Sequence, residues 1–213
     1  MANVPFKNGD RILFQGDSIT DCGCRDRTNV NPIGTGYVAM IRGALAQRFP
    51  ELKVQVLNRG NSGDRTIELL ARWQDECIGL KPTWLSIKIG VNDVWRKRDA
   101  WGGQGHVPLP EYIANYRRLL DQARDSGIKN LVLVSPTTID DEPESELNEL
   151  LAKYDAAVVE LAKEYGAIYV PAREKLWKAI ALNPEVRWTT DGCHPTTAGH
   201  GLIADAWLDA VLY

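Results

Sequence analysis

The chain alternates between strand-like and helix-like segments along its whole length, and this alternation limits the folds it can adopt. Short apolar segments with strand character occur at 11–15, 53–58, 84–89, 130–135 and 167–170. Apolar residues at helical spacing, or helix-compatible stretches, fill the gaps at 37–49, 66–79, 110–126, 147–161, 172–182 and 196–211. Strands joined through helices need right-handed crossovers, so we predict a parallel five-stranded sheet with helices on both faces.

The length of 213 residues suffices for one substantial core, and we predict a single domain over residues 1–213. A net charge of −3 leaves no excess of basic residues to neutralise phosphates, so we expect no nucleic-acid partner. No segment has the length and apolarity of a membrane span, so we expect no membrane partner. The N-terminal segment lacks the apolar core of a secretory signal, and we therefore expect a cytoplasmic product.

The chain contains four cysteines, Cys22, Cys24, Cys77 and Cys193. Cys22 and Cys24 are one residue too close together for the usual zinc-binding pair, and there is no second pair. We expect free thiols, and we expect neither a metal nor an organic cofactor. Cys193 lies in a loop marked by glycine and proline, where we expect the thiol to pack inward rather than to act as a nucleophile.

Polar segments follow three of the predicted strands, at residues 16–20, 60–64 and 90–93. A fourth segment, 191–195, precedes the last predicted helix. In an open parallel sheet, ligands bind beyond the carboxyl ends of the strands. We therefore expect these segments to meet at one edge of the sheet.

Asp191 and His194 place a carboxylate and an imidazole three positions apart in one short loop. A buried carboxylate that accepts a hydrogen bond from Nδ1 would fix the histidine tautomer, leaving Nε2 free to take a proton from a nucleophile. Ser18, at the end of the first predicted strand, is the candidate nucleophile. These residues predict a Ser-His-Asp catalytic triad.

A serine that attacks an acyl carbon creates an oxyanion, which needs hydrogen-bond donors already in place. The backbone N–H of Ser18 is one candidate donor. A glycine after the second strand is another, because the backbone can approach closely where there is no Cβ, and Gly60 and Gly63 both fit. The side-chain amide of Asn92 is the third candidate.

Four blocks of this sequence resemble, in order and approximate spacing, the signature blocks of the SGNH (GDSL-type) hydrolases. The blocks are Gly16-Asp17-Ser18-Ile19, residues 58–64, Gly90-Val-Asn92-Asp93 and Asp191-Gly-Cys-His194-Pro195. The Gly-x-Ser-x-Gly elbow of ordinary α/β-hydrolases is absent, because Thr20 stands where that motif needs glycine. The resemblance implies a flavodoxin-like, three-layer, doubly wound sheet.

The same resemblance implies a role for each matched residue. Ser18 would be the nucleophile, with Asp191 and His194 completing the triad. Gly63 and Asn92 would join the backbone of Ser18 in the oxyanion hole. The resemblance thus favours Gly63 over the other glycine of that loop.

Further segments are similar to the intracellular acetylxylan esterases of xylan-degrading bacteria. They are Thr35-Gly-Tyr-Val-Ala39, Ala71-Arg-Trp73 and residues 89–96 and 194–200, whereas 22–34 and 142–146 depart from that subgroup. We therefore predict a serine esterase that removes acetyl groups from xylo-oligosaccharides or related sugars. The alternatives are a broad short-chain carboxylesterase or lysophospholipase-like enzyme, for which a longer apolar groove is expected, and a catalytically silent carbohydrate-binding protein, which would lack a triad member.

Trp95 and Trp188 lie close in sequence to the candidate site residues. An aromatic face there could hold the acyl group or stack on a sugar ring. The equally good alternative is that both side chains only pack the loops. The stretch 96–108, rich in glycine and charge, is predicted to be a surface loop near the site that meets a neighbouring subunit in a homo-oligomer.

Five other polar residues have simpler interpretations. Asp17 and Asp93, beside candidate site residues, are expected to shape turns by hydrogen bonding. His106 and His200 have no carboxylate at motif spacing, so we expect ordinary structural roles. Lys88 is a charge within an apolar strand, and it either extends to the rim of the sheet or meets a carboxylate there.

Overall fold

The computed structural model describes residues 4–26, 32–98 and 105–213, so the predicted loop 96–108 lies partly outside the described residues. One sheet contains the strands β1 (Arg11–Gly16), β2 (Gln55–Gly60), β3 (Trp84–Lys88), β4 (Asn130–Val134) and β5 (Ile168–Val170). Their spatial order is β2-β1-β3-β4-β5, and every neighbouring pair is parallel. This is the flavodoxin-like order, with its switch point between β1 and β3, as predicted.

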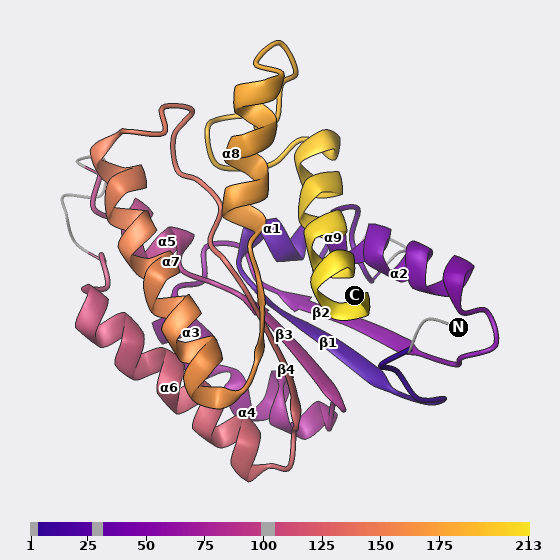
Figure 1. Cartoon of the computed structure of the whole chain (residues 1–213). Helices are drawn as coiled ribbons and strands as arrows, with labels where there is room; N and C mark the ends of the chain where they lie inside the picture. The colour runs from indigo at the N-terminus through magenta and orange to yellow at the C-terminus, as the bar shows by residue number, and fades with distance from the viewer. Residues whose placement is uncertain (1–3, 27–31, 99–104) are drawn as a thin grey trace.

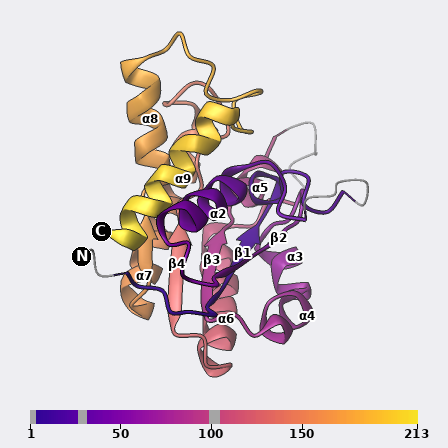
Figure 2. The same cartoon turned by 90° about the vertical axis from the view of Figure 1, so that its right-hand side faces the viewer.

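Helices cover both faces of this sheet (Figure 1). One layer consists of α2 (Tyr37–Arg48), α8 (Ala172–Leu182) and α9 (Thr197–Leu212). The other consists mainly of α3 (Thr66–Ala71), α6 (Leu109–Asp125) and α7 (Glu146–Tyr165), as the turned view in Figure 2 also shows. The three-layer architecture expected from the alternating pattern is therefore confirmed. No described helix is long and apolar enough to cross a membrane.

Aromatic side chains fill the space between the sheet and each helix layer. On the α9 side, the Phe14 ring lies 5.4 Å from that of Trp207, whose Nε1 donates to Ser86 Oγ at 3.1 Å. On the opposite side, the rings of Tyr112 and Tyr154 are 4.8 Å apart. All of these side chains are essentially removed from water, which stabilises the layers through apolar burial.

The predicted helix over 66–79 is divided into three shorter pieces. They are α3, α4 (Trp73–Glu76) and the 3-10 helix η1 (Ile78–Leu80). The chain leaves α-helical geometry at Arg72, with φ −103° and ψ 5°, and again at Cys77. Apolar spacing could not show this break, because Arg72 turns its side chain toward Asp64 and the end of β1 rather than toward solvent.

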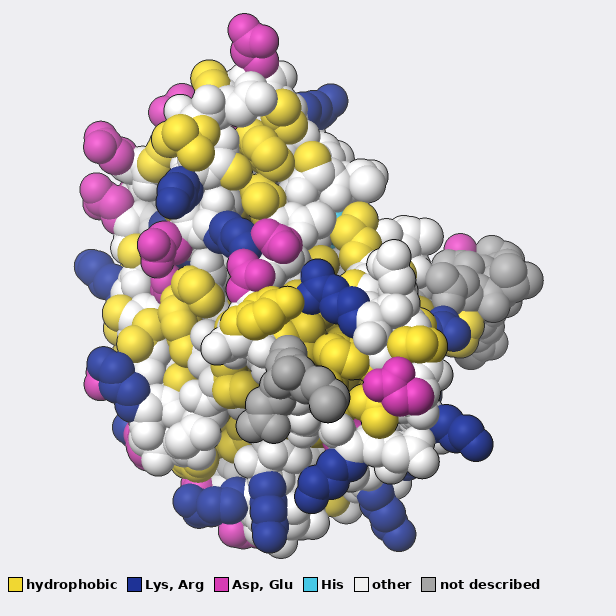
Figure 3. Space-filling view, turned by 45° about the vertical axis from the view of Figure 1, so that its right-hand side comes forward, with side chains coloured by type: hydrophobic (Ala, Val, Ile, Leu, Met, Phe, Trp, Pro, Cys, Tyr) yellow, Lys and Arg dark blue, Asp and Glu magenta, His cyan; other side chains and the backbone are white. Residues whose placement is uncertain are grey.

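A groove with a volume of about 660 Å³ runs between α8 and α9. Leu182, which is 77% exposed, is among the apolar side chains that line this groove. Figure 3 shows apolar side chains gathered over the upper part of the molecule. None of the predicted site residues lines the groove. The candidate site therefore lies elsewhere, at the carboxyl edge of the sheet.

Candidate active site

Ser18 stands two residues beyond β1, at the first position of the short helix α1 (Ser18–Asp21). Asp17 caps this helix, because its Oδ1 accepts the N–H of Ile19 at 3.0 Å. Gly16 has to lack a side chain, since a Cβ there would collide with Thr20 and with the backbone of Lys88. The turn thus holds Ser18 at the strand end.

Ser18, His194 and Asp191 form a continuous hydrogen-bonded line. Ser18 Oγ lies 3.0 Å from His194 Nε2, and His194 Nδ1 lies 2.8 Å from Asp191 Oδ2. The other carboxylate oxygen, Asp191 Oδ1, accepts the backbone N–H groups of Cys193 at 3.1 Å and His194 at 2.8 Å. With Nδ1–H donated to the carboxylate, Nε2 is left as the acceptor that faces the serine hydroxyl.

Asp191 differs from the buried carboxylate that the sequence argument assumed, since its side chain is 48% exposed and that of His194 is 45% exposed. The loop that carries both residues lies outside the sheet edge, between α8 and α9. Burial on its own would favour the neutral acid, but the backbone and ring N–H groups of His194 hold the pKa of Asp191 below its usual value. Hydrogen bonds, rather than burial, therefore orient this carboxylate.

The loop around Asp191 is fastened to its surroundings through Thr189. Thr189 Oγ1 donates to Asp141 Oδ1 at 2.7 Å and accepts the N–H of Gly192 at 3.1 Å. Gly192 has φ +82°, and a Cβ there would press against the backbone of Asp140 and Asp141. The segment after β4 thereby supports the loop from below.

The candidate oxyanion donors come from three different elements. Gly63, with φ +85°, lies in the loop after β2, and Asn92 lies in the first turn of α5 (Val91–Trp95). Within the described residues, the backbone N–H groups of Ser18 and Gly63 have no protein acceptor. The N–H of Gly60 differs, because it donates to Asn58 Oδ1 at 2.9 Å. Of the two glycines that the sequence left open, only Gly63 has an N–H available for a substrate.

The two predicted tryptophans, Trp95 and Trp188, differ in their contacts with the candidate site. The Trp95 ring centroid lies 6.4 Å from that of His194, and the Arg98 guanidinium covers the Trp95 ring at 4.1 Å. The Trp188 indole donates to the carbonyl of Asn183 at 3.0 Å, and no described contact joins Trp188 to Ser18 or His194. Trp95 is therefore a neighbour of the site, while a role for Trp188 stays a prediction.

Lys88 does not extend to solvent. It is fully buried at the end of β3, and its Nζ donates to Thr137 Oγ1 at 3.4 Å. Burial lowers the pKa of the Lys88 amine, against the attraction of the Asp17 carboxylate. Burial likewise raises the pKa of the Asp17 carboxyl, although the charge of Lys88 opposes this rise. Asp17 Oδ2 has no hydrogen-bond partner among the described residues. Extension to solvent at the rim is therefore wrong. Among the described residues, the hydrogen bond of the amine is to a hydroxyl, and the Asp17 carboxylate acts on the amine through its charge.

Asp93 shapes a turn, as expected. It accepts the Thr66 hydroxyl at 2.6 Å and the Thr66 N–H at 3.0 Å, which fixes the start of α3. Burial raises the pKa of Asp93 to about 7. Cys193 packs inward with 3% exposure, again as expected, and burial raises the pKa of its thiol.

The remaining histidines have the structural roles that we expected. His106 Nε2 lies 3.2 Å from the Tyr154 hydroxyl. His200 Nδ1 accepts the N–H of Tyr37 at 3.2 Å, and burial, with the charges of Lys88 and His194, lowers its pKa to about 4. In the described part of the chain, no group of three or more His, Cys, Asp or Glu side chains could hold a metal ion.

Comparison with known families agrees with this arrangement. A family model for GDSL-like lipases and acylhydrolases matches residues 14–202. The chain belongs to this family. The match begins within β1 and extends into α9, so in this GDSL-like hydrolase it includes Ser18 after β1 as well as Asp191 and His194 before α9.

Two curated relatives of this GDSL-like hydrolase are esterases. It is 35% identical over 206 residues to an acetylxylan esterase of Geobacillus stearothermophilus, covering 94% of this chain and 93% of the relative. It is 26% identical over 223 residues to an isoamyl acetate-hydrolyzing esterase of Saccharomyces cerevisiae, covering 95% and 86%.

The crystal structure of the Geobacillus acetylxylan esterase superposes on this chain with a TM-score of 0.87, at 34% identity, covering 97% of this chain and 95% of that one. Structures of that enzyme described as catalytic mutants, with a serine, an aspartate or a histidine changed to alanine, match equally well. The chain therefore shares both the fold and the family of a characterised esterase.

Some residues around the site were not predicted to take part in it. They include Arg72, Arg98, Asp141 and Thr189, which contact site residues or the loops that carry them. Arg98 had a signal in the sequence, because it belongs to the stretch 96–108 that was predicted to lie near the site. Arg72 also had one, since Ala71-Arg-Trp73 is one of the segments similar to acetylxylan esterases. That similarity, however, suggested no role for the side chain.

Proposed function

We propose that this GDSL-like hydrolase is a serine esterase that removes acetyl groups from xylo-oligosaccharides through an acyl-serine intermediate. The observation that carries the proposal is the line from Ser18 Oγ to His194 Nε2 and from His194 Nδ1 to Asp191. The catalytic serine, aspartate and histidine mutants of the related Geobacillus enzyme support the same choice of residues.

In the first step, Ser18 Oγ attacks the acyl carbon of the ester while its proton passes to His194 Nε2. The ester C–O bond then breaks, and His194 returns the proton to the departing sugar oxygen. In the second step, His194 takes a proton from water as the water oxygen attacks the acyl-serine, which releases the carboxylic acid and restores the serine hydroxyl. Asp191 accepts Nδ1–H throughout and stabilises the imidazolium.

The negative oxygen formed in each step needs donors that are already aimed at it. The backbone N–H groups of Ser18 and Gly63, which lack protein acceptors in the described residues, are well suited to this role. The Asn92 amide is the third donor, because one of its N–H groups is fixed on the carbonyl of Asp64 at 3.0 Å and the other remains for the substrate.

The acetyl group is the substrate feature with the most support. The relatives are named for acetylxylan and for isoamyl acetate, two esters that share the acetyl group and differ in the alcohol. Arg98 covers one face of Trp95 at 4.1 Å and also pairs with Asp140 at 3.3 Å, so this indole is held in place. A fixed indole beside His194 suits a small acyl group better than a long one.

The test compares acetate release from acetylated xylo-oligosaccharides and isoamyl acetate with hydrolysis of p-nitrophenyl esters of increasing acyl length. We expect acetyl esters to be preferred, and the oligosaccharide to have the highest kcat/KM. Preference for long acyl chains would favour the lysophospholipase-like alternative, and release from isoamyl acetate alone would favour a general short-chain esterase.

Ser18→Ala is the control for the chemical step. The variant should lose turnover of p-nitrophenyl acetate by several orders of magnitude while it keeps its fold, because no other group forms the acyl intermediate. A fluorophosphonate should attach covalently to Ser18 in the wild type. Undiminished activity in the variant, or labelling of another serine, would overturn the proposed function.

The four cysteines are all free thiols, Cys77 and Cys193 buried and Cys22 and Cys24 partly so. Free thiols are typical of reducing compartments. They support a cytoplasmic location as part of this proposal. Mass spectrometry of the purified protein after thiol alkylation would test it, since a disulfide would contradict the assignment.

A further inference from the structure

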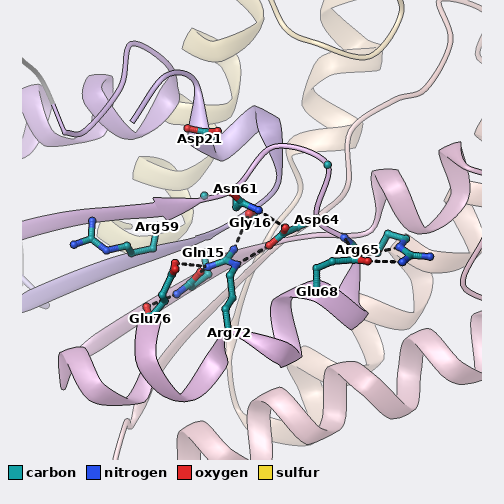
Figure 4. A network of polar contacts seen from close by, with 12 residues as sticks. Gln15, Gly16, Asp21, Arg59, Asn61, Asp64, Arg65, Glu68, Arg72 and Glu76 are labelled. Atoms are coloured by element: carbon teal, nitrogen blue, oxygen red, sulfur yellow. Dashed lines mark hydrogen bonds and ion pairs between the residues drawn. The ribbon is translucent and has the colours of Figure 1, made fainter. Parts of the chain in front are cut away.

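Arg72 lies between α3 and α4, and the mechanism above gives it no task (Figure 4). Its side chain is only 13% exposed. Nε donates to Asp64 Oδ2 at 2.6 Å, and the terminal nitrogens donate to Gln15 Oε1 at 2.6 Å, to the Gly16 carbonyl at 3.2 Å and to Glu76 Oε2 at 3.2 Å. A largely buried guanidinium with acceptors on separate elements holds those elements in a fixed arrangement.

One side of this guanidinium contacts the strand end that carries the nucleophile. Gln15 and Gly16 are the last residues of β1, and Ser18 follows two positions later. The Gly16 carbonyl also accepts the N–H of Asn61 at 2.9 Å, so the loop after β2 is fastened to the same point. Arg72 is therefore hydrogen-bonded to the end of β1 just before Ser18.

The other side contacts the loop that carries the oxyanion donors. Asp64 is 2% exposed and directly follows Gly63, and its side chain also accepts from Asn61 Nδ2 at 2.5 Å. The backbone carbonyl of Asp64 accepts from Asn92 Nδ2 at 3.0 Å. The position of Asp64 therefore determines both where the Gly63 peptide lies and how the Asn92 amide is turned.

We propose that Arg72 is a positioning residue that sets the Gly63 and Asn92 donors at the correct place relative to Ser18. The inference rests on the proposed function, because it assigns Arg72 to the oxyanion hole of that mechanism. Arg72 does not touch the reacting atoms and acts through Asp64. Lysine is a poor substitute, since one ammonium on a flexible stem cannot donate to Asp64 and to the end of β1 in the fixed geometry of a guanidinium.

The test begins with Arg72→Met and Arg72→Lys, assayed with p-nitrophenyl acetate. Small displacements of catalytic groups cost up to about a hundredfold in rate, so we expect kcat to fall by about tenfold to a hundredfold in the methionine variant. The lysine variant should lie between this variant and the wild type. In both, KM should change much less than kcat, because the donors bind charge that exists only in the transition state.

Arg117→Met is the matched control. Arg117 pairs with Glu164 at 2.9 Å between α6 and α7, away from the sheet edge, and its side chain is 50% exposed. Removing this ion pair should leave kcat at the wild-type value. Urea unfolding of every variant shows whether a loss of kcat is merely a loss of folded protein.

A double-mutant cycle separates positioning from a general structural role. If Arg72 acts through the donors, Arg72→Met should reduce kcat less in an Asn92→Ala background than in the wild type. An equal loss in both backgrounds, or a folded Arg72→Met variant with wild-type kcat, would overturn the proposal. If the methionine variant does not fold, Arg72→Lys is used in the same cycle.

Failure of this inference can be told apart from failure of the proposed function. If Asn92→Ala leaves kcat unchanged, or if a fluorophosphonate does not label Ser18, the mechanism itself is wrong. If Asn92→Ala lowers kcat as expected and the cycle shows no coupling, only the role of Arg72 is wrong.

Discussion

The two halves of the candidate site are held in place in different ways. The half at the sheet edge rests on buried polar side chains, with Asp17, Asp64 and Asp93 each exposed by 2% or less. The half on the loop before α9 is open to solvent, with Asp191 and His194 side chains exposed by 48% and 45%. Ser18 Oγ and His194 Nε2 are the atoms at which the two halves meet.

Because of this difference in burial, substitutions in the two halves should affect stability and activity differently. In the buried half, a lost hydrogen bond leaves a polar group without water, so a substitution costs folding free energy as well as rate. In the open half, water can replace a lost partner, and a substitution there should change the rate with little effect on unfolding. Variants in each half therefore test whether stability and turnover depend on different parts of the site.

Asp191→Asn should give the largest loss in the open half. The amide cannot accept Nδ1–H of His194 while its oxygen also accepts the two backbone N–H groups, so the ring takes up the wrong tautomer. A loss in kcat on the order of a thousandfold or more follows from this mechanism. The urea unfolding midpoint should stay close to that of the wild type. A harmless substitution would mean that another group orients His194.

Asn92→Ala tests the buried half and should have the next largest effect. Removal of one oxyanion donor lowers kcat by about a hundredfold or more and leaves KM nearly unchanged. Asn130→Ala is the control, because Asn130 Nδ2 also donates to a backbone carbonyl, that of Thr83 at 2.8 Å, but at the opposite end of the sheet. An effect on KM alone would assign Asn92 to substrate binding.

The centre of the sheet could be predicted from the sequence because β1, β3 and β4 are largely buried. All five residues of β3 are removed from water, and its apolar residues Trp84, Leu85 and Ile87 mark the strand between polar turns. The segments after β1, β2 and β3 could be placed at one edge of the sheet because parallel strands bring their carboxyl ends together. The position of Ser18 at this edge of the sheet therefore followed from local pattern and topology.

Side-chain direction was beyond the reach of these patterns. Helical spacing over 66–79 gave Arg72 no special place, although its guanidinium reaches across to β1. The interval between Asp191 and His194 carries no information on burial. Nor could closeness in sequence distinguish Trp95, which lies beside His194, from Trp188, which bonds back to Asn183. The directions of Arg72 and Trp95 depend on contacts between segments distant in the chain, and the Trp188 bond, although it spans only five residues, has no signature in the spacing of apolar residues.

Thr189→Val should have a smaller effect than the changes to Asn92 or Asp191. Valine has the shape of threonine but lacks the hydroxyl that joins Asp141 to the N–H of Gly192. The loop then loses one tether but keeps the turn around Asp191, so we expect about a tenfold loss in kcat. Because Thr189 is buried, unlike Asp191 and His194 in the same loop, the unfolding free energy should also fall by about 1 kcal/mol. Thr189→Ser, which keeps the hydroxyl, should restore both, and failure to do so would contradict a role for this hydrogen bond.

Asp93→Asn should affect turnover least. The pH dependence of its unfolding free energy tests whether this buried carboxyl is neutral in the folded protein. Burial raises the pKa of Asp93 to about 7 in the folded protein, whereas an aspartate in an unfolded chain titrates near 4.

The folded state therefore holds this proton more tightly, and its contribution to stability is complete below about pH 4 and is lost as the pH rises toward 7. Within this window the unfolding free energy should fall by up to about 1.4 kcal/mol for each pH unit because of Asp93. Asparagine does not titrate, so the variant should lack this part of the slope, while kcat stays nearly unchanged because Oδ1 can still accept from Thr66.

Asp17, whose pKa is also raised by burial, is present in both proteins, so the difference between their slopes isolates Asp93. Asp191 adds nothing to the slope in this window. Because its pKa is lowered, its contribution to stability is constant there and is lost only at more acidic pH. Urea unfolding of both proteins at a series of pH values measures the two slopes. Equal slopes would mean that Asp93 stays charged where it is buried, and the contrast between a neutral buried carboxyl and an ionised exposed one would not hold.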